Sequence, residues 1–131
     1  MIAKLLKTKL HREHIALFVI LLVTFLMRLP SLFEPFWYGD EGIFAAVGRS
    51  LNFGKILYID AWDNKPPMIY LTYAAIFKLF SVSMFSLRLV TAIVVLATSA
   101  CIYEIALKIT TKKRALTAAF IFGLLTSIRI F

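Results

Sequence analysis

Four charged residues stand where their side chains could act at a membrane surface. Asp40 and Glu41 are adjacent acids that follow the first apolar run of the chain. A carboxylate at that depth is partly desolvated, which suits it to accept a proton as a general base. Lys65 stands before two prolines, so a rigid turn directs its ammonium toward the surface where lipid phosphates lie. Arg88 opens a later apolar run and could also bind a phosphate.

Each of these residues also has a purely structural interpretation. Asp40 could cap a short helix, and Glu41 could favour the dipole of its first turn. Lys65 could be an ordinary lysine whose stem lies along apolar surface. Arg88 could simply anchor the helix that it opens. Taken singly, Asp40 and Lys65 fit the structural interpretation better, so any functional prediction depends on the combination.

The composition places the chain among membrane proteins. Of its 131 residues, 61% are hydrophobic and 17% are charged. Soluble domains are about 45–50% apolar and about 25% charged. The net charge of +8 could suggest nucleic acid, but the bases cluster beside apolar runs, as expected for cytoplasmic flanks. These bases are Lys4, Lys7, Lys9 and Arg12 before the first run, and Lys108, Lys112, Lys113 and Arg114 between two later runs.

Three apolar runs predict membrane-spanning helices, over about 13–30, 88–108 and 115–131. A helix needs about 20 residues to cross roughly 30 Å of hydrocarbon. The first run follows a basic segment but lacks a small-residue cleavage site, which indicates an uncleaved signal anchor with a cytoplasmic N-terminus. We therefore expect an all-α, multi-pass protein of the plasma or inner membrane, with a single membrane domain over residues 1–131.

The segment between the first two spans, about 31–87, is expected outside the membrane. It holds five of the seven acids of the chain. Apolar residues at helical spacing predict a short helix over about 40–51, ended by Asn52-Phe53-Gly54. A second helix is expected over about 67–80. Lys78 at its middle makes crossing costly, by roughly 2.5–3.5 kcal/mol, so this helix should lie at the interface.

The remaining candidate ligands carry little signal. Cys101 lies alone within an apolar run, and His11 and His14 flank the first span. None of them has metal-ligand spacing. The types and spacing of these residues do not identify a cofactor.

Four short stretches, taken together, resemble the N-terminal part of glycosyltransferases with the GT-C fold. They are RLP at 28–30, GDEGIFA at 39–45, NKPPMIY at 64–70 and SLRL at 86–89. The pattern is similar to glycosyltransferase family 39, which includes protein O-mannosyltransferases and aminoarabinose transferases. The resemblance covers most of residues 13–110.

The resemblance implies a role for each of the four charged residues. Asp40 would be the catalytic base that takes the proton from an acceptor hydroxyl. Glu41 would assist at the catalytic site, on the acceptor side or as a ligand to a divalent metal ion. Lys65 would bind the phosphate of a polyprenyl-phosphate-linked sugar donor, and Arg88 would add to that phosphate site. The reaction would be an inverting sugar transfer with the lipid phosphate as leaving group.

The sequence thus predicts the N-terminal portion of an integral membrane glycosyltransferase that acts at the outer membrane face. Its partners would be the lipid-linked donor and membrane lipids, with no nucleic acid, and its acceptor is not specified. Since family members carry further spans and external loops, we expect this portion alone to be inactive. The alternative is a non-catalytic small membrane subunit or a transporter fragment whose external acids are structural.

Overall fold

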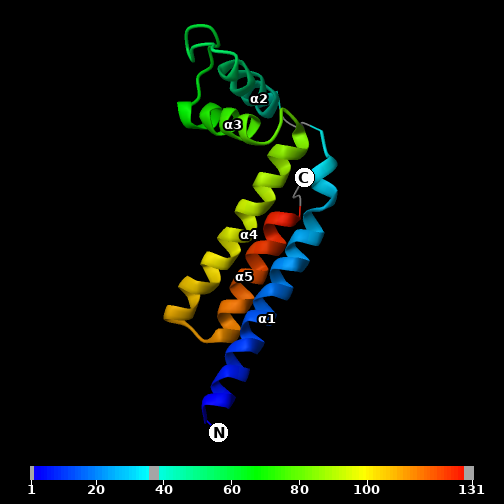
Figure 1. Cartoon of the computed structure of the whole chain (residues 1–131), viewed down its shortest axis with the longest axis vertical. Helices are drawn as coiled ribbons and strands as arrows, with labels where there is room; N and C mark the ends of the chain where they lie inside the picture. Colours follow the sequence, from blue (N-terminus) through cyan, green and yellow to red (C-terminus); the bar gives the residue numbers. More distant parts are fainter. Residues whose placement is uncertain (1, 36–38, 129–131) are drawn as a thin grey trace. The chain divides into compact units, whose positions relative to one another are not determined.

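The computed structural model describes residues 2–35 and 39–128, and their side chains from His14 onward. This part of the chain is helical, which confirms the all-α prediction (Figure 1). Its elements are α1 (Ile2–Arg28), a 3-10 helix η1 (Pro30–Phe33), α2 (Gly39–Asn52), α3 (Pro67–Leu79), α4 (Met84–Ile109) and α5 (Lys112–Ser127).

The chain divides into two compact units. One unit, which we call the helix bundle, comprises Met1–Leu29 and Ala92–Phe131. The other, which we call the loop unit, is Pro30–Thr91. Helix α4 begins in the loop unit and continues through the bundle. Each unit is described separately below.

Small residues allow close packing in the helix bundle. Helix α5 buries Ala115, Ala119 and Gly123, which recur every fourth residue and so share one face. At Gly123 a Cβ atom would overlap the side chain of Thr24 on α1. The hydroxyl of Ser99 on α4 donates a hydrogen bond of 2.9 Å to the carbonyl of Ala119. Small side chains and interhelical hydrogen bonds are typical of helices that associate within a bilayer.

Among the described residues, two helical segments are long and apolar enough to cross a membrane. They are His14–Phe33 and Met84–Ile109. Both expose large apolar side chains, including Phe18 on the first and Ile105 on the second. Helix α5 has 16 residues in the described part of the chain and is not one of the two. The third span, over about 115–131, stays a prediction.

Helices α2 and α3 pack against each other in the loop unit (Figure 1). They agree with the helices expected over about 40–51 and 67–80. The amide of Asn52 donates a hydrogen bond of 2.9 Å to the carbonyl of Ala74 on α3. The chain leaves α2 through Gly54, whose φ of +81° suits glycine and ends the helix where the sequence predicts. Pro67 occupies the first turn of α3, where its missing N–H costs no hydrogen bond.

Helix α4 begins earlier than its apolar pattern suggests. The pattern places the start near residue 88, whereas the helix starts at Met84. The cause is a cap: the Ser83 hydroxyl accepts a hydrogen bond of 3.1 Å from the backbone N–H of Ser86, which satisfies a donor of the first turn. The helix thus starts four residues before the span expected over about 88–108, and Arg88 lies in its second turn.

The close approach of α2 to α3 gives a stability prediction. A Cβ atom at Gly48 would lie 2.6 Å from Cβ of Tyr73 and 3.0 Å from the backbone nitrogen of Ala74. Neither atom belongs to a flexible side-chain end, so Gly48→Ala should destabilise the loop unit by about 1–3 kcal/mol. Thermal unfolding in detergent, followed by circular dichroism, would measure the change.

Gly42→Ala is the matched control, because the position is also on α2 but has no atom within 4 Å of the place that an added methyl would take. Alanine favours the helix over glycine, so this variant should be neutral or more stable by a few tenths of a kcal/mol up to about 1. Equal melting temperatures for the two variants would contradict the close contact at Gly48.

Candidate active site

Asp40 and Lys65 lie beside each other, although 25 positions separate them in the sequence. The Lys65 ammonium is 3.9 Å from Oδ2 of Asp40, and their side chains are 44% and 64% exposed. Asp40 is in the first turn of α2, and Lys65 lies just before α3. The packing of α2 on α3 therefore joins an exposed carboxylate and an exposed cation at one surface.

Asp40 does not cap its helix. Helix α2 starts at Gly39, so Asp40 lies inside the first turn, and the cap position falls outside the described residues. The capping interpretation of Asp40 is therefore wrong. Its carboxylate still gains from the helix dipole, and it makes no capping hydrogen bond to the part of the chain that the structure describes.

Glu41 and Arg88 form a second and tighter pair. The Arg88 guanidinium donates hydrogen bonds of 3.0 and 2.8 Å to the two oxygens of Glu41, and one of 3.2 Å to the carbonyl of Pro35. The Arg88 side chain is only 17% exposed and the Glu41 side chain only 26%. This two-pronged geometry is the strong form of a carboxylate–guanidinium contact. It ties the first turn of α2, and hence Asp40, to the second turn of α4.

The pairing bears on what Glu41 and Arg88 can do. Both oxygens of Glu41 accept a hydrogen bond from Arg88, so the charge of this carboxylate is already compensated. Residues 14–35 and 39–128 contain no group of three or more His, Cys, Asp or Glu side chains that could hold a metal. The catalytic role expected for Glu41 and the phosphate role expected for Arg88 stay predictions.

A set of tyrosines that the sequence did not single out surrounds Lys65. The hydroxyl of Tyr58 donates a hydrogen bond of 2.7 Å to the Lys65 carbonyl. The hydroxyl of Tyr70 donates one of 2.7 Å to the carboxylate of Asp63. The rings of Tyr58 and Tyr70 meet edge to face. Tyr70 belongs to the NKPPMIY stretch, so the sequence could have pointed to it as a site residue. No pattern in the sequence points to Tyr58.

The contact between Tyr70 and Asp63 shifts both groups. Burial, and then the hydrogen bond to Asp63, raise the pKa of Tyr70 to about 12. The same hydrogen bond, aided by the Asn64 backbone N–H, lowers the pKa of Asp63. A free tyrosine titrates near pH 10. The folded state therefore holds the Tyr70 proton more tightly, and this contact should lose stability as the pH rises from about 10 to 12.

The Tyr70 shift can be measured by absorbance at 295 nm during an alkaline titration in detergent. We expect the component that disappears in Tyr70→Phe to titrate near pH 12, with helical circular dichroism still present at the start of that step. If the absorbance change that is lost in Tyr70→Phe is instead centred near pH 10, the buried hydrogen bond is contradicted.

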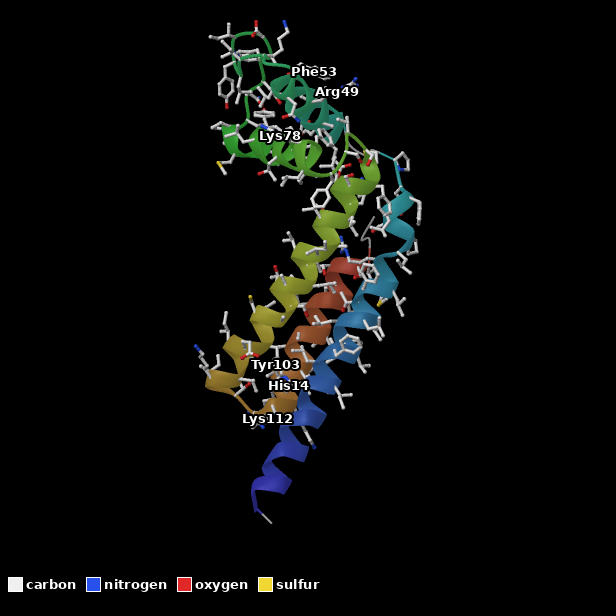
Figure 2. The ribbon with its side chains drawn as sticks, in the orientation of Figure 1. His14, Arg49, Phe53, Lys78, Tyr103 and Lys112 are labelled. Carbon is white, nitrogen blue, oxygen red and sulfur yellow. The ribbon has the colours of Figure 1, made fainter. Side chains whose placement is uncertain are left out.

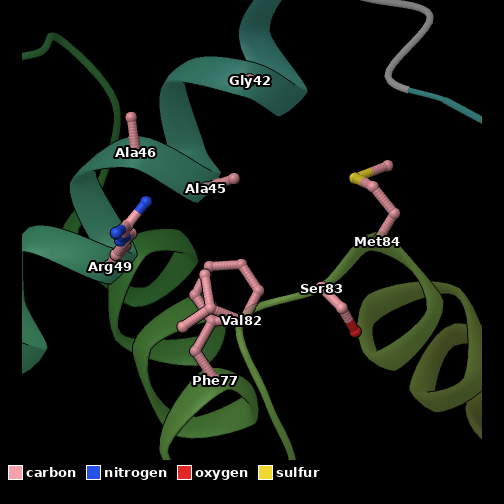
Figure 3. Close-up of a pocket in the computed structure, with 8 residues that line it drawn as sticks. All are labelled: Gly42, Ala45, Ala46, Arg49, Phe77, Val82, Ser83 and Met84. Atoms are coloured by element: carbon pink, nitrogen blue, oxygen red, sulfur yellow. The ribbon is translucent and has the colours of Figure 1, made fainter.

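An apolar hollow of about 310 Å³ lies between α2, the end of α3 and the start of α4 (Figure 3). It is lined by Gly42, Ala45, Ala46, Arg49, Phe77, Val82, Ser83 and Met84. The Arg49 guanidinium also lies over the ring of Phe53, 5.7 Å from its centre (Figure 2). None of the four charged residues expected at the active site lines this hollow, so it is distinct from the Asp40–Lys65 surface.

Comparison with known proteins adds one finding. A family model described as dolichyl-phosphate-mannose-protein mannosyltransferase matches residues 64–129, which is half of the chain. The matched part includes Lys65 and Arg88 and begins after Asp40 and Glu41. No curated protein and no solved structure matches the chain. The match contains two of the four short stretches, those at 64–70 and 86–89, and the chain belongs to the dolichyl-phosphate-mannose-protein mannosyltransferase family.

Proposed function

We propose that this chain carries part of the active site for sugar transfer from a polyprenyl-phosphate-linked donor to an acceptor hydroxyl. The observation that carries the proposal is the 3.9 Å separation of Asp40 and Lys65 at an exposed surface. A base and a phosphate-binding cation are the two groups that such a transfer needs. Family membership supports the donor class, since the family is named for a polyprenyl-phosphate sugar.

In the proposed reaction, Lys65 binds the donor phosphate and Asp40 faces the acceptor. The acceptor oxygen bonds to the anomeric carbon while its proton passes to Asp40. The bond from that carbon to the phosphate oxygen breaks, and its electron pair leaves on the phosphate. Lys65 stabilises the charge that develops there. Attack opposite the leaving phosphate inverts the anomeric configuration.

The contact between Lys65 and Asp40 is compatible with these roles because it is easily opened. Exposed ion pairs contribute about 0.2–1 kcal/mol, and a separation of 3.9 Å is long for a charge-assisted hydrogen bond. The donor phosphate is a diester with one negative charge, as a carboxylate has, and its two free oxygens can replace Asp40 as the partner of Lys65. Donor binding would then release Asp40 to accept the acceptor proton.

The proposed function is tested by donor consumption. Membranes from cells expressing the whole reading frame would be incubated with labelled polyprenyl-phosphate sugars, one hexose or pentose at a time, and free polyprenyl phosphate would be measured. We expect release with at least one donor, above membranes that lack the protein. Absence of release from every donor, with the protein inserted and helical, would favour the non-catalytic membrane subunit.

We further propose that the loop unit faces the outer side of the membrane and the N-terminus the cytoplasm. Ile59 is 76% exposed and lies in the irregular segment between α2 and α3. In a Cys101→Ser background, Ile59→Cys should therefore react in intact cells with a thiol reagent that cannot cross the membrane. Labelling that requires lysis of the cells would reverse the proposed orientation.

A further inference from the structure

We propose that Tyr58 and Tyr70 are positioning residues that hold Lys65 opposite Asp40. The inference deepens the proposed function and rests on it, because it assigns a purpose to the two hydroxyls around the phosphate-binding lysine. Their hydroxyls contact the Lys65 carbonyl and the Asp63 carboxylate. Each acts through the backbone or side chain of the segment from Asp63 to Lys65.

Tyr58 has an unusual backbone. Its φ is +67°, a left-handed conformation that residues other than glycine seldom adopt. Such conformations persist where the surrounding structure enforces them, and they are concentrated at functional sites. The backbone N–H of Tyr58 donates a hydrogen bond of 2.9 Å to the Ala61 carbonyl. The phenol of Tyr58 in turn reaches the Lys65 carbonyl at 2.7 Å.

A small turn enforces this conformation. The carboxylate of Asp60 accepts a hydrogen bond of 2.8 Å from the backbone N–H of Ile56. The backbone N–H of Asp60 donates one of 2.9 Å to the Ile56 carbonyl. These bonds close the loop over residues 56–60 around Tyr58.

Tyr70 connects Lys65 to the helix that carries Asp40. Its side chain is fully buried on α3, and its hydroxyl holds Asp63, two residues before Lys65. Its ring meets Phe44 edge to face, with centroids 5.8 Å apart. Phe44 is one turn after Asp40 on α2. A continuous set of contacts therefore runs from α2 through Tyr70 to the segment that presents Lys65.

These contacts matter because a lysine side chain is long and flexible. Pro66 already restricts the backbone of Lys65 to extended conformations. Tyr58 fixes its carbonyl, and the Tyr70–Asp63 contact fixes the segment before it. Fixing the backbone limits where the ammonium can reach, and misplacement of such a group by about 1 Å can cost two orders of magnitude in rate.

The test compares Tyr58→Phe and Tyr70→Phe with Tyr73→Phe. Tyr73 is on α3 and also meets Phe44 edge to face, and its hydroxyl makes no hydrogen bond to the residues that the structure describes. Each protein would be placed in phosphatidylcholine nanodiscs and titrated with dolichyl phosphate and, separately, with undecaprenyl phosphate. Removing one hydrogen bond should weaken phosphate binding about twofold to tenfold for the first two variants, and leave it unchanged for Tyr73→Phe.

Two further measurements separate positioning from general stability. In a Lys65→Ala background, Tyr58→Phe should have no further effect on affinity, because the group it positions is gone. Hydrogen exchange of the amides of residues 56–65 should be faster in Tyr58→Phe and unchanged in Tyr73→Phe. If Tyr58→Phe failed to fold, Tyr58→Asn would replace it, since asparagine tolerates positive φ.

The outcomes are distinguishable. If Lys65→Ala weakens phosphate binding while Tyr58→Phe and Tyr70→Phe bind like the wild type, the positioning role is overturned. The same follows if Tyr58→Phe weakens binding equally with and without Lys65. If exchange is faster in Tyr58→Phe but Lys65→Ala binds normally, the proposed phosphate role of Lys65 fails, although the tyrosines still hold the segment.

Discussion

Replacing Asp40 with asparagine should lower the rate of sugar transfer by about 10²- to 10⁴-fold, the range that a positioned general base contributes. Asparagine has nearly the same shape but cannot accept the acceptor proton. The side chain is exposed and caps no helix, so stability should hardly change. Transfer from a labelled polyprenyl-phosphate sugar, measured in native membranes, gives the rate.

The same variant should keep or improve its affinity for polyprenyl phosphate. Asp40 and the phosphate compete for Lys65, and an amide competes less well than a carboxylate. Asp40→Glu is a useful control, because it retains a base but shifts it outward, and it should recover part of the activity. A wild-type rate of transfer in Asp40→Asn would remove Asp40 from the mechanism.

Lys65→Ala should have the second largest effect. Loss of a cation that stabilises the leaving phosphate should lower transfer by about 10²- to 10³-fold. Affinity for polyprenyl phosphate should fall about tenfold to a hundredfold, since a hydrogen bond to a charged group contributes about 1.5–3 kcal/mol. Titration in nanodiscs measures the affinity, and the membrane assay measures transfer.

Lys55→Ala is the matched control for Lys65→Ala. Lys55 also lies exposed in the segment between α2 and α3, and it takes part in no ion pair with the residues that the structure describes. Its loss changes the net charge equally, so a general electrostatic effect on lipid phosphates would appear in both variants. Equal weakening by Lys55→Ala and Lys65→Ala would count against a specific phosphate site at Lys65.

The helices are predictable because their signals are local. Apolar residues at helical spacing and the stop at Asn52-Phe53-Gly54 predict α2, and the two prolines predict the start of α3. Helix α4 starts at Met84, before its apolar pattern begins, because Ser83 caps the helix through a single hydroxyl. A cap of this kind leaves no trace in a hydrophobic pattern.

Which charged residues pair with each other in the candidate site is harder to predict from the sequence than which residues belong to the candidate site. The sequence points to all four charged residues, but it cannot show that Arg88 binds Glu41 while Lys65 faces Asp40. Pairing of that kind depends on the register of α2 against α3 and on the extra turn at the start of α4. Tyr58 gives no sequence signal, because the role proposed for it depends on a left-handed backbone and a turn closed by Asp60.

The most direct test of the central claim measures phosphate binding and sugar transfer together in wild type, Asp40→Asn and Lys65→Ala. If the two residues form one site with divided roles, Asp40→Asn binds polyprenyl phosphate at least as well as wild type but does not transfer sugar. Lys65→Ala loses binding and transfer together. Wild-type transfer by both variants would contradict the account, as would equal loss of phosphate binding in the two.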